Sequence, residues 1–135
     1  MDVRLKRAYE EPGADDGSRV LVDRVWPRGR SRESLALVAW ERDVAPSDEL
    51  RRWFGHEPAR WDEFRRRYLA ELASPDRQPA LDRLARLSRG GRLTLVYGAA
   101  DAEHNQAVVI REALLEHPAG GQEQGPPFDR RRATS

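Results

Sequence analysis

Three segments of the chain carry the hydrophobic patterns of β-strands. Residues 2–7 alternate between apolar and charged side chains, which is the period of a strand. Residues 20–22 form a continuous apolar run, which is typical of an interior strand covered on both faces and predicts a strand over 19–24. A second alternating segment predicts a strand over 92–97. A sheet of at least three strands is therefore expected.

Helical patterns fill the stretch between the second and third of these strands. Ser47 is a favourable N-cap and Gly55 a favourable C-terminal residue, so a short helix is expected over 48–54. Pro58 suits the first turn of the next helix. The apolar stripe of that helix recurs every three or four positions at Trp61, Phe64, Tyr68 and Leu72. The leucine spacing from 81 to 87 predicts a third helix, which ends at Gly90-Gly91.

A last helix is expected over 102–117 with Asp101 as its N-cap. The segment 35–42 is either an edge strand or irregular. Helices that separate apolar strands imply crossovers and a parallel sheet. The sequence therefore predicts a single α/β domain over residues 1–117. Its core is a small parallel or mixed sheet of three to four strands flanked by helices. Residues 118–135, rich in Gly, Pro, Gln and Arg, are expected to form a disordered tail.

Composition narrows the classes of function. The 135 residues include 24 basic and 23 acidic side chains, which leave a formal net charge of +1. This balance makes nucleic acid an unfavoured partner, because a broad basic face is not expected. Cysteine is absent, which excludes disulfides, zinc–thiolate sites and cysteine nucleophiles. No apolar run is long enough to span a membrane and no signal-peptide core opens the chain, so a cytoplasmic protein is expected.

Candidate chemistry gathers in the two loops that follow the second and the last predicted strand, at residues 23–30 and 98–105. Ligands of parallel sheets bind beyond the carboxyl ends of the strands. Guanidinium forks in the first loop suit a phosphate or carboxylate, and backbone N–H groups at the helix start in the second loop attract anions. The predicted ligand is thus an anionic small molecule. The candidate catalytic residues are Asp23 and His104, and the candidate ligand-binding residues are Arg24, Trp26, Arg28, Gly98, Asp101 and Asn105.

Each loop also has a purely structural interpretation. Asp23 can pair with Arg24 or Arg28 and hold its loop, while Trp26 fills the edge of the core. Asp101 can simply cap the last helix while His104 bonds the adjacent loop. The three histidines lack the spacing of a metal site, and neither loop has a nucleotide-binding glycine motif, so no metal and no cofactor are predicted.

Three motifs together resemble a known family. VDRxWPRG, APSxELRxWFGH and YGAADAEHNQAV lie within residues 19–29, 45–56 and 97–108. They are similar to the YeaO-like branch of the family called domain of unknown function 488, and the similarity extends over residues 2–116. The family's motif positions fall on Asp23, Arg24, Trp26, Pro27, Arg28, Gly29, Trp40, Pro46, Ser47, Trp53, Phe54, His56, Tyr97, Gly98, His104 and Asn105.

The resemblance implies a bacterial or archaeal, cytoplasmic α/β protein and no particular reaction. A longer branch of the family carries a cysteine motif where this chain has residues 97–105, so the thiol chemistry of that branch does not transfer. Some members are labelled transcription regulators, but this sequence has no helix-turn-helix with a basic recognition helix.

Three functional hypotheses follow, and they leave open whether the chain is an enzyme. The first is a ligand-binding domain or small enzyme with an anion-accepting cleft. It is favoured because charged and aromatic residues concentrate at one predicted edge of the sheet. The second is a non-catalytic protein-interaction module, and the third is a nucleic-acid-associated protein. Fold alone does not separate them.

Overall fold

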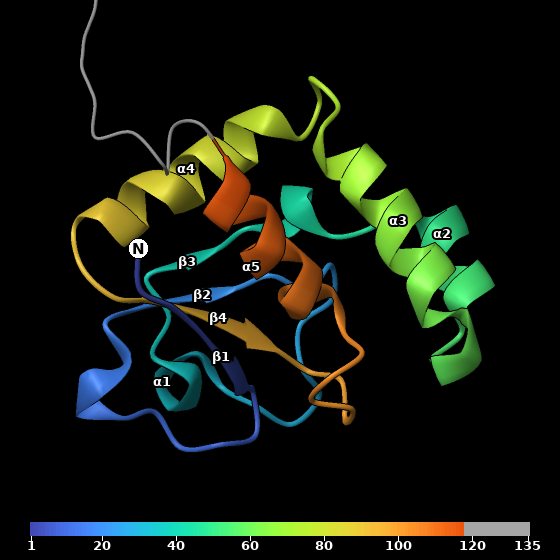
Figure 1. The fold of residues 1–135 in the computed structure, drawn as a ribbon. Helices are drawn as coiled ribbons and strands as arrows, with labels where there is room; N and C mark the ends of the chain where they lie inside the picture. Colours follow the sequence, from blue (N-terminus) through green and yellow to red (C-terminus); the bar gives the residue numbers. More distant parts are fainter. Residues whose placement is uncertain (118–135) are drawn as a thin grey trace, which may run out of the picture.

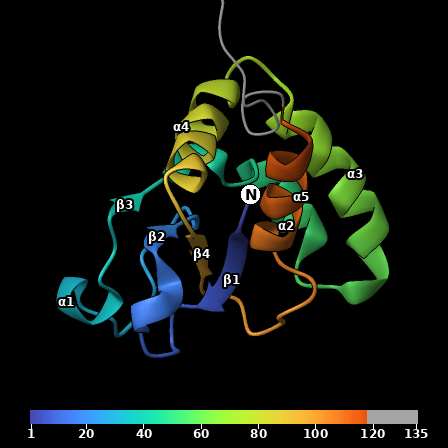
Figure 2. The same ribbon diagram turned by 60° about the vertical axis from the view of Figure 1, so that its left-hand side comes forward.

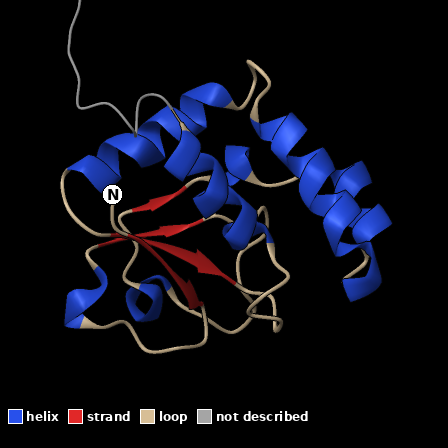
Figure 3. Cartoon of the chain, viewed as in Figure 1, coloured by secondary structure: helices blue, strands red, loops and turns tan. Residues whose placement is uncertain are grey.

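The centre of the fold is a parallel sheet with the strand order β1-β4-β2-β3. A computed structural model describes residues 1–117, and the expected tail at 118–135 lies outside these residues. The strands are β1 Val3–Arg7, β2 Ser18–Leu21, β3 Ala39–Trp40 and β4 Leu93–Tyr97 (Figure 3). All three pairings, β1 with β4, β4 with β2 and β2 with β3, are parallel. The predicted α/β fold with a parallel sheet is therefore confirmed.

The apolar run that follows Arg19 lies in the interior of the sheet, as expected. Val20, Leu21 and Val22 are each 0% exposed, because Val20 and Val22 pack in the cluster on one face of the sheet and Leu21 packs in the cluster on the other. Of the three predicted strands, however, β4 is the middle one, and β2 becomes interior only through β3. The two residues of β3 fall inside the segment 35–42 and make part of it an edge strand.

Helices cover the two faces of the sheet unequally (Figures 1 and 2). On one face lie α3 (Trp61–Leu72), α4 (Gln78–Arg89) and α5 (Gln106–Glu116), with α2 (Asp48–Phe54) packed beside α3. The short helix α1 (Arg32–Leu35), which the sequence pattern did not predict, lies against the other face. Three 3-10 turns complete the described elements, at Ala14–Asp16, Arg42–Val44 and Pro58–Arg60.

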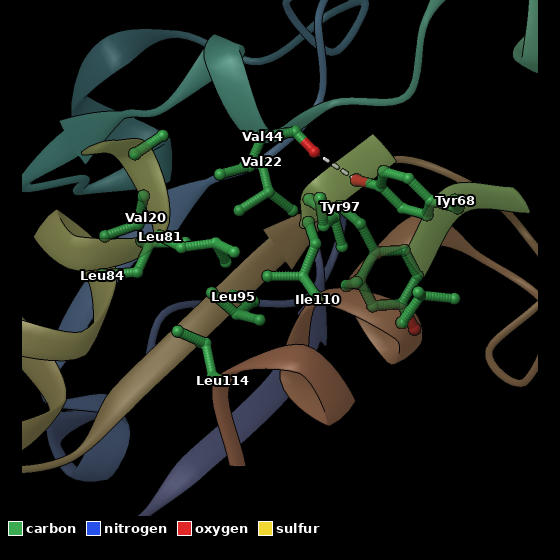
Figure 4. Packing of buried hydrophobic residues seen from close by; sticks show 14 of the residues in the cluster. Val20, Val22, Val44, Tyr68, Leu81, Leu84, Leu95, Tyr97, Ile110 and Leu114 are labelled. Carbon is green, nitrogen blue, oxygen red and sulfur yellow. Dashed lines mark hydrogen bonds between the residues drawn. The ribbon is translucent and has the colours of Figure 1, made fainter. Parts of the chain in front are cut away.

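The alternation of strand side chains divides the core into two clusters. Val20 of β2 and Leu95 of β4 point toward the larger helical layer, whereas Leu21 and Val96 point toward α1. Figure 4 shows the larger cluster, in which the hydroxyl of the fully buried Tyr68 donates a hydrogen bond to the carbonyl of Val44. This bond ties α3 to the segment that leads into α2.

Local capping explains α2, which has the predicted bounds. The hydroxyl of Ser47 accepts a hydrogen bond from the N–H of Leu50 at 3.2 Å. Gly55 ends the helix in the left-handed conformation with φ of 54°. Pro58 opens a 3-10 turn that leads directly into α3, so the expected helix begins three residues later as an α-helix.

The start of α5 was predicted wrongly. Its N-cap is Asn105, whose Oδ1 accepts hydrogen bonds from the N–H groups of Ala107 and Val108 at 2.9 and 3.3 Å. Asp101 instead caps a turn ahead of the helix by accepting from the N–H groups of Glu103 and His104. His104 therefore precedes the helix and does not lie in its first turn.

We expect Asn105→Ala to lower the free energy of unfolding by about 1–2 kcal/mol, because two helix N–H groups lose their acceptor. Asp101→Ala is the matched control and should cost less, since Asp101 caps only a half-exposed turn. Urea unfolding followed by tryptophan fluorescence measures both values. A larger cost for Asp101→Ala would contradict the assignment of the cap.

Candidate functional site

The two loops singled out from the sequence meet at the carboxyl ends of β2 and β4. Because these strands are parallel neighbours, both loops leave the sheet at the same edge. The Asp23 carboxylate joins them, since its Oδ2 accepts a hydrogen bond from the N–H of Gly98 at 2.8 Å. Its Oδ1 accepts a hydrogen bond from the side-chain amide of Gln106, in the first turn of α5. One carboxylate thus holds two strand ends and a helix start together.

Gly98 is required for this contact by its lack of a side chain. A Cβ at this position would lie 2.9 Å from Oδ2 of Asp23, closer than such atoms approach in proteins. The glycine therefore lets the carboxylate reach the backbone at the end of β4.

A cavity of about 370 Å³ opens beside this carboxylate. Three segments of the chain contribute most of its walls: the loop after β2, the segment from 45 to 56 around α2, and the loop after β4. The lining residues are Asp23, Arg24, Val25, Ala45, Pro46, Arg51, Phe54, His56, Phe64, Gly98, Ala99 and Gln106.

Asp23 has an electrostatic environment unlike that of a surface carboxylate. Burial raises the pKa of Asp23 to about 6, and the hydrogen bond from the N–H of Gly98 partly opposes this effect. Within residues 1–117 the carboxylate forms no ion pair with a cation. Arg24, its chain neighbour, turns away and donates from Nη2 to the carbonyl of Pro46 at 3.1 Å. The ion pair of Asp23 with Arg24 or Arg28 that the structural interpretation offered is not formed.

Two arginines of the cavity wall share a single carboxylate. Nε of Arg24 lies 3.5 Å from Oδ1 of Asp48, and Nη2 of Arg51 lies 3.4 Å from the same oxygen. Two positive charges against one negative charge leave this group with a net charge of +1. All three side chains are more than two-fifths exposed, so their guanidinium groups remain accessible to a ligand.

Aromatic rings form the apolar wall. Phe54 of α2 and Phe64 of α3 stack with their centroids 4.3 Å apart and an interplanar angle of 23°. His56 follows the end of α2 in the left-handed conformation, with φ of 58°, and its ring lies 6.2 Å from that of Phe54. The cavity therefore combines an apolar wall, a partly buried acid and a cationic pair.

Trp26 and Arg28, which the sequence placed in the site, do not line the cavity. Trp26 packs edge-on against Trp40 at 5.3 Å in the cluster that faces α1, and its indole N–H donates to the carbonyl of Arg30 at 2.6 Å. Arg28 is exposed, and its carbonyl accepts a hydrogen bond from the hydroxyl of Tyr9. The loop after β2 thus contributes only Asp23, Arg24 and Val25 to the cavity.

The loop after β4 is divided in the same way. Gly98 lines the cavity, whereas Asp101, His104 and Asn105 do not. Nδ1 of His104 lies 2.8 Å from Oδ2 of Asp101, and its ring meets the edge of Trp61 at 5.2 Å. The N–H of Glu103, followed by the ring of His104, holds the pKa of Asp101 below its usual range. His104 and Asp101 thus form a separate pair beside the cavity wall.

The sequence reasoning missed several residues that line the cavity. Arg51 and Phe54 belong to α2, which the sequence analysis interpreted only as a capped helix. Phe64 was assigned to the apolar stripe of the next helix. Gln106 directly follows the loop that was considered. Phe54 and His56 were both family motif positions, which was the available signal.

The described part of the chain forms neither a metal site nor a membrane-spanning helix. No group of three or more His, Asp or Glu residues there could hold a metal ion. None of the helices described between residues 1 and 117 is long and apolar enough to cross a membrane.

Sequence comparison places the chain in a family. The model of a family described as the "Inactive DUF488-N3 subclade" matches residues 2–129. The chain belongs to this subclade. It is 40% identical over 114 residues to "Uncharacterized protein YeaO" of Escherichia coli K12, which covers 84% of this chain and 97% of that protein. It is 41% identical over 112 residues to "Uncharacterized protein Rv3073c" of Mycobacterium tuberculosis H37Rv, which covers 83% and 92%. No solved structure is significantly similar to it.

The motifs that carry the DUF488 resemblance converge on the cavity. The segments 19–29, 45–56 and 97–108 are far apart in the sequence, yet they supply every lining residue except Phe64. This convergence makes the cavity the part of the fold to which a function can most directly be attached.

Proposed function

We propose that this chain is a small-molecule-binding domain whose cavity at the carboxyl ends of β2 and β4 takes a ligand with an acidic group. The observation that carries the proposal is the arginine pair at the cavity, where Arg24 and Arg51 share the single carboxylate of Asp48. A guanidinium pair with an uncompensated positive charge attracts a carboxylate or phosphate. The volume of about 370 Å³ lies within the range of small-molecule sites.

The proposed role is binding without covalent catalysis. The chain has no cysteine, and the cavity lining contains no serine or lysine that could act as a nucleophile. The word "inactive" in the family description is consistent with this proposal. The stacked rings of Phe54 and Phe64 suit an apolar body on the ligand, in addition to its acidic group.

A suitable first probe is 3-phenylpropionate, which joins a carboxylate to an aromatic ring. In an NMR titration at low salt, we expect saturable shifts of the backbone amides of Val25, Gly98 and Gln106. 3-Phenylpropanol, which has the same body without the charge, should bind more weakly. Added salt should weaken the binding of 3-phenylpropionate but not that of 3-phenylpropanol, because exposed charges are screened.

Arg51→Gln tests the acid-binding group with little disturbance of the fold, because within residues 1–117 the Arg51 side chain bonds only to Asp48. We expect the affinity for 3-phenylpropionate to fall about fivefold, which corresponds to roughly 1 kcal/mol for a half-exposed charge pair. Arg66→Gln is the matched control, since Arg66 is an exposed arginine of α3 that pairs with Glu63. No saturable shift up to about 20 mM, or an equal effect of both variants, would overturn the proposal and favour the interaction-module hypothesis.

A further inference from the structure

The acidic ligand proposed above leaves one side chain of the cavity, the carboxylate of Asp23, without a role. Asp23 lines the same space as the arginine pair, yet its carboxylate has no cationic partner among the described residues. A carboxylate that is partly buried, as Asp23 is, and has no counter-charge is unfavourable in a folded protein. Such a group at a cavity wall is therefore available for a positive group from outside the chain.

The hydrogen bonding of Asp23 leaves room for such a group. An ionised carboxylate offers about four lone-pair positions. The N–H of Gly98 occupies one position on Oδ2, and the amide of Gln106 occupies one on Oδ1. Each oxygen thus keeps an acceptor position, and both bonds hold the carboxylate in a fixed orientation at the cavity.

The cation nearest in sequence does not fill this position. The guanidinium of Arg24 is bound by the carbonyl of Pro46 and by Asp48, on the side of α2. The cavity therefore has a negative group where the sheet ends and a positive group beside α2, with the rings of Phe54 and Phe64 also in its wall. A ligand with a single charge would satisfy only one of these two groups.

We propose that the ligand of this cavity is a zwitterion, a small aminocarboxylate or aminophosphate with an apolar body, whose amino group is bound by Asp23. The inference rests on the proposed function, because the acidic group of the same molecule is bound by the Arg24–Arg51 pair. An ammonium group donates up to three hydrogen bonds and supplies the missing counter-charge. Asp23 is then a specificity-determining residue that separates amino acids and their relatives from simple organic acids.

Two pairs of matched probes isolate the contribution of the amino group to the binding affinity. L-Phenylalanine and 3-phenylpropionate differ only by an α-amino group, and 4-(aminomethyl)benzoate and 4-methylbenzoate differ by an amino group placed farther from the acid. In NMR or calorimetric titrations of the full chain at pH 7.5, one amino-bearing member should bind at least about tenfold more tightly than its partner, as a charge-assisted hydrogen bond implies. Phenethylamine, which lacks the acid, should bind more weakly than L-phenylalanine.

Asp23→Asn should abolish this gain and slightly raise the affinity for the simple acids, because it removes a negative charge from the cavity. Asparagine has the same shape, and rotation of the Gln106 amide allows both existing hydrogen bonds to be kept. Gly98→Ala is a second variant, because its Cβ would displace the carboxylate without removing its charge. Asp62→Asn, at an exposed position in the first turn of α3, is the matched control and should retain the tenfold gain.

The outcomes separate the two proposals. If the simple acids bind but neither amino group improves affinity, or if the gain survives in Asp23→Asn, the zwitterion is excluded and the acid-binding cavity remains. If none of the probes binds to the unaltered chain, the proposed function itself fails.

Discussion

Asp23→Asn is expected to raise the free energy of unfolding at pH 7.5 by about 2 kcal/mol. Burial raises the pKa of Asp23 from 3.8 to about 6, so ionisation opposes folding. A shift of this size corresponds to about 3 kcal/mol. Asp23 is only partly buried, and its exposure to solvent and the hydrogen bond from Gln106 both favour the ionised form, so the expected effect is reduced accordingly. Asparagine keeps the shape and has no charge to bury.

The pH dependence of this difference follows from the sign of the shift. Below about pH 4 the carboxyl is protonated in both the folded and the unfolded chain, so the two proteins should be nearly equally stable. Between about pH 4 and 6 the unfolded chain releases this proton before the folded chain does, and the stability contributed by protonated Asp23 is lost. Above the pKa of Asp23 in the folded chain, this contribution to stability is lost completely.

Urea unfolding at pH 4, 5, 6 and 7.5 measures the difference, with Asp62→Asn as the control for an exposed carboxylate of α3. Other carboxylates titrate in the same range, but they are common to both proteins and cancel in the comparison. An Asp23→Asn protein that is less stable than the unaltered chain at pH 7.5 would show that Asp23 is held as a favourable structural carboxylate. The availability of Asp23 to a ligand cation would then lose its support.

The fold was predictable from the sequence where local chemistry and burial agree. The apolar run at 20–22 requires cover on both faces, and Ser47 and Gly55 fix the ends of α2 by their own hydrogen bonding and conformation. The meeting of the loops after β2 and β4 follows from the parallel topology. That step places Asp23 beside Gly98 although 75 positions separate them.

The features that the sequence did not predict depend on choices between equivalent local signals. Asp101 and Asn105 are both favourable N-caps, and only the packing of α5 on the sheet selects the buried Asn105. Arg24, Trp26 and Arg28 are neighbours in one loop, yet only Arg24 lines the cavity, while Trp26 packs on Trp40 in the cluster that faces α1. The contribution of Arg51 depends on how α2 packs beside α3, which no local pattern specifies.

Phe64→Ala is expected to lower the free energy of unfolding by about 3–5 kcal/mol. The ring is 2% exposed, stacks on Phe54 and contacts Trp61 and Tyr68 with centroids 5.6 and 5.5 Å away. Its loss therefore leaves a void in the cluster that joins α2 to α3. Because Phe64 also lines the cavity, binding of 3-phenylpropionate should weaken, and Phe64→Leu should retain most of the stability with a smaller loss of binding.

Trp26→Ala separates stability from binding, because Trp26 lies in the cluster facing α1 and does not line the cavity. The half-buried indole packs on Trp40 and donates one hydrogen bond, so its removal should cost about 2–3 kcal/mol, less than the loss of Phe64. The affinity of the folded protein for 3-phenylpropionate should be unchanged. Urea titrations and binding measurements on both variants test this ranking. If Trp26→Ala weakened binding as strongly as Phe64→Leu, the loop after β2 would contact the ligand through its tryptophan, and the cavity beside Asp23 would not be the binding site.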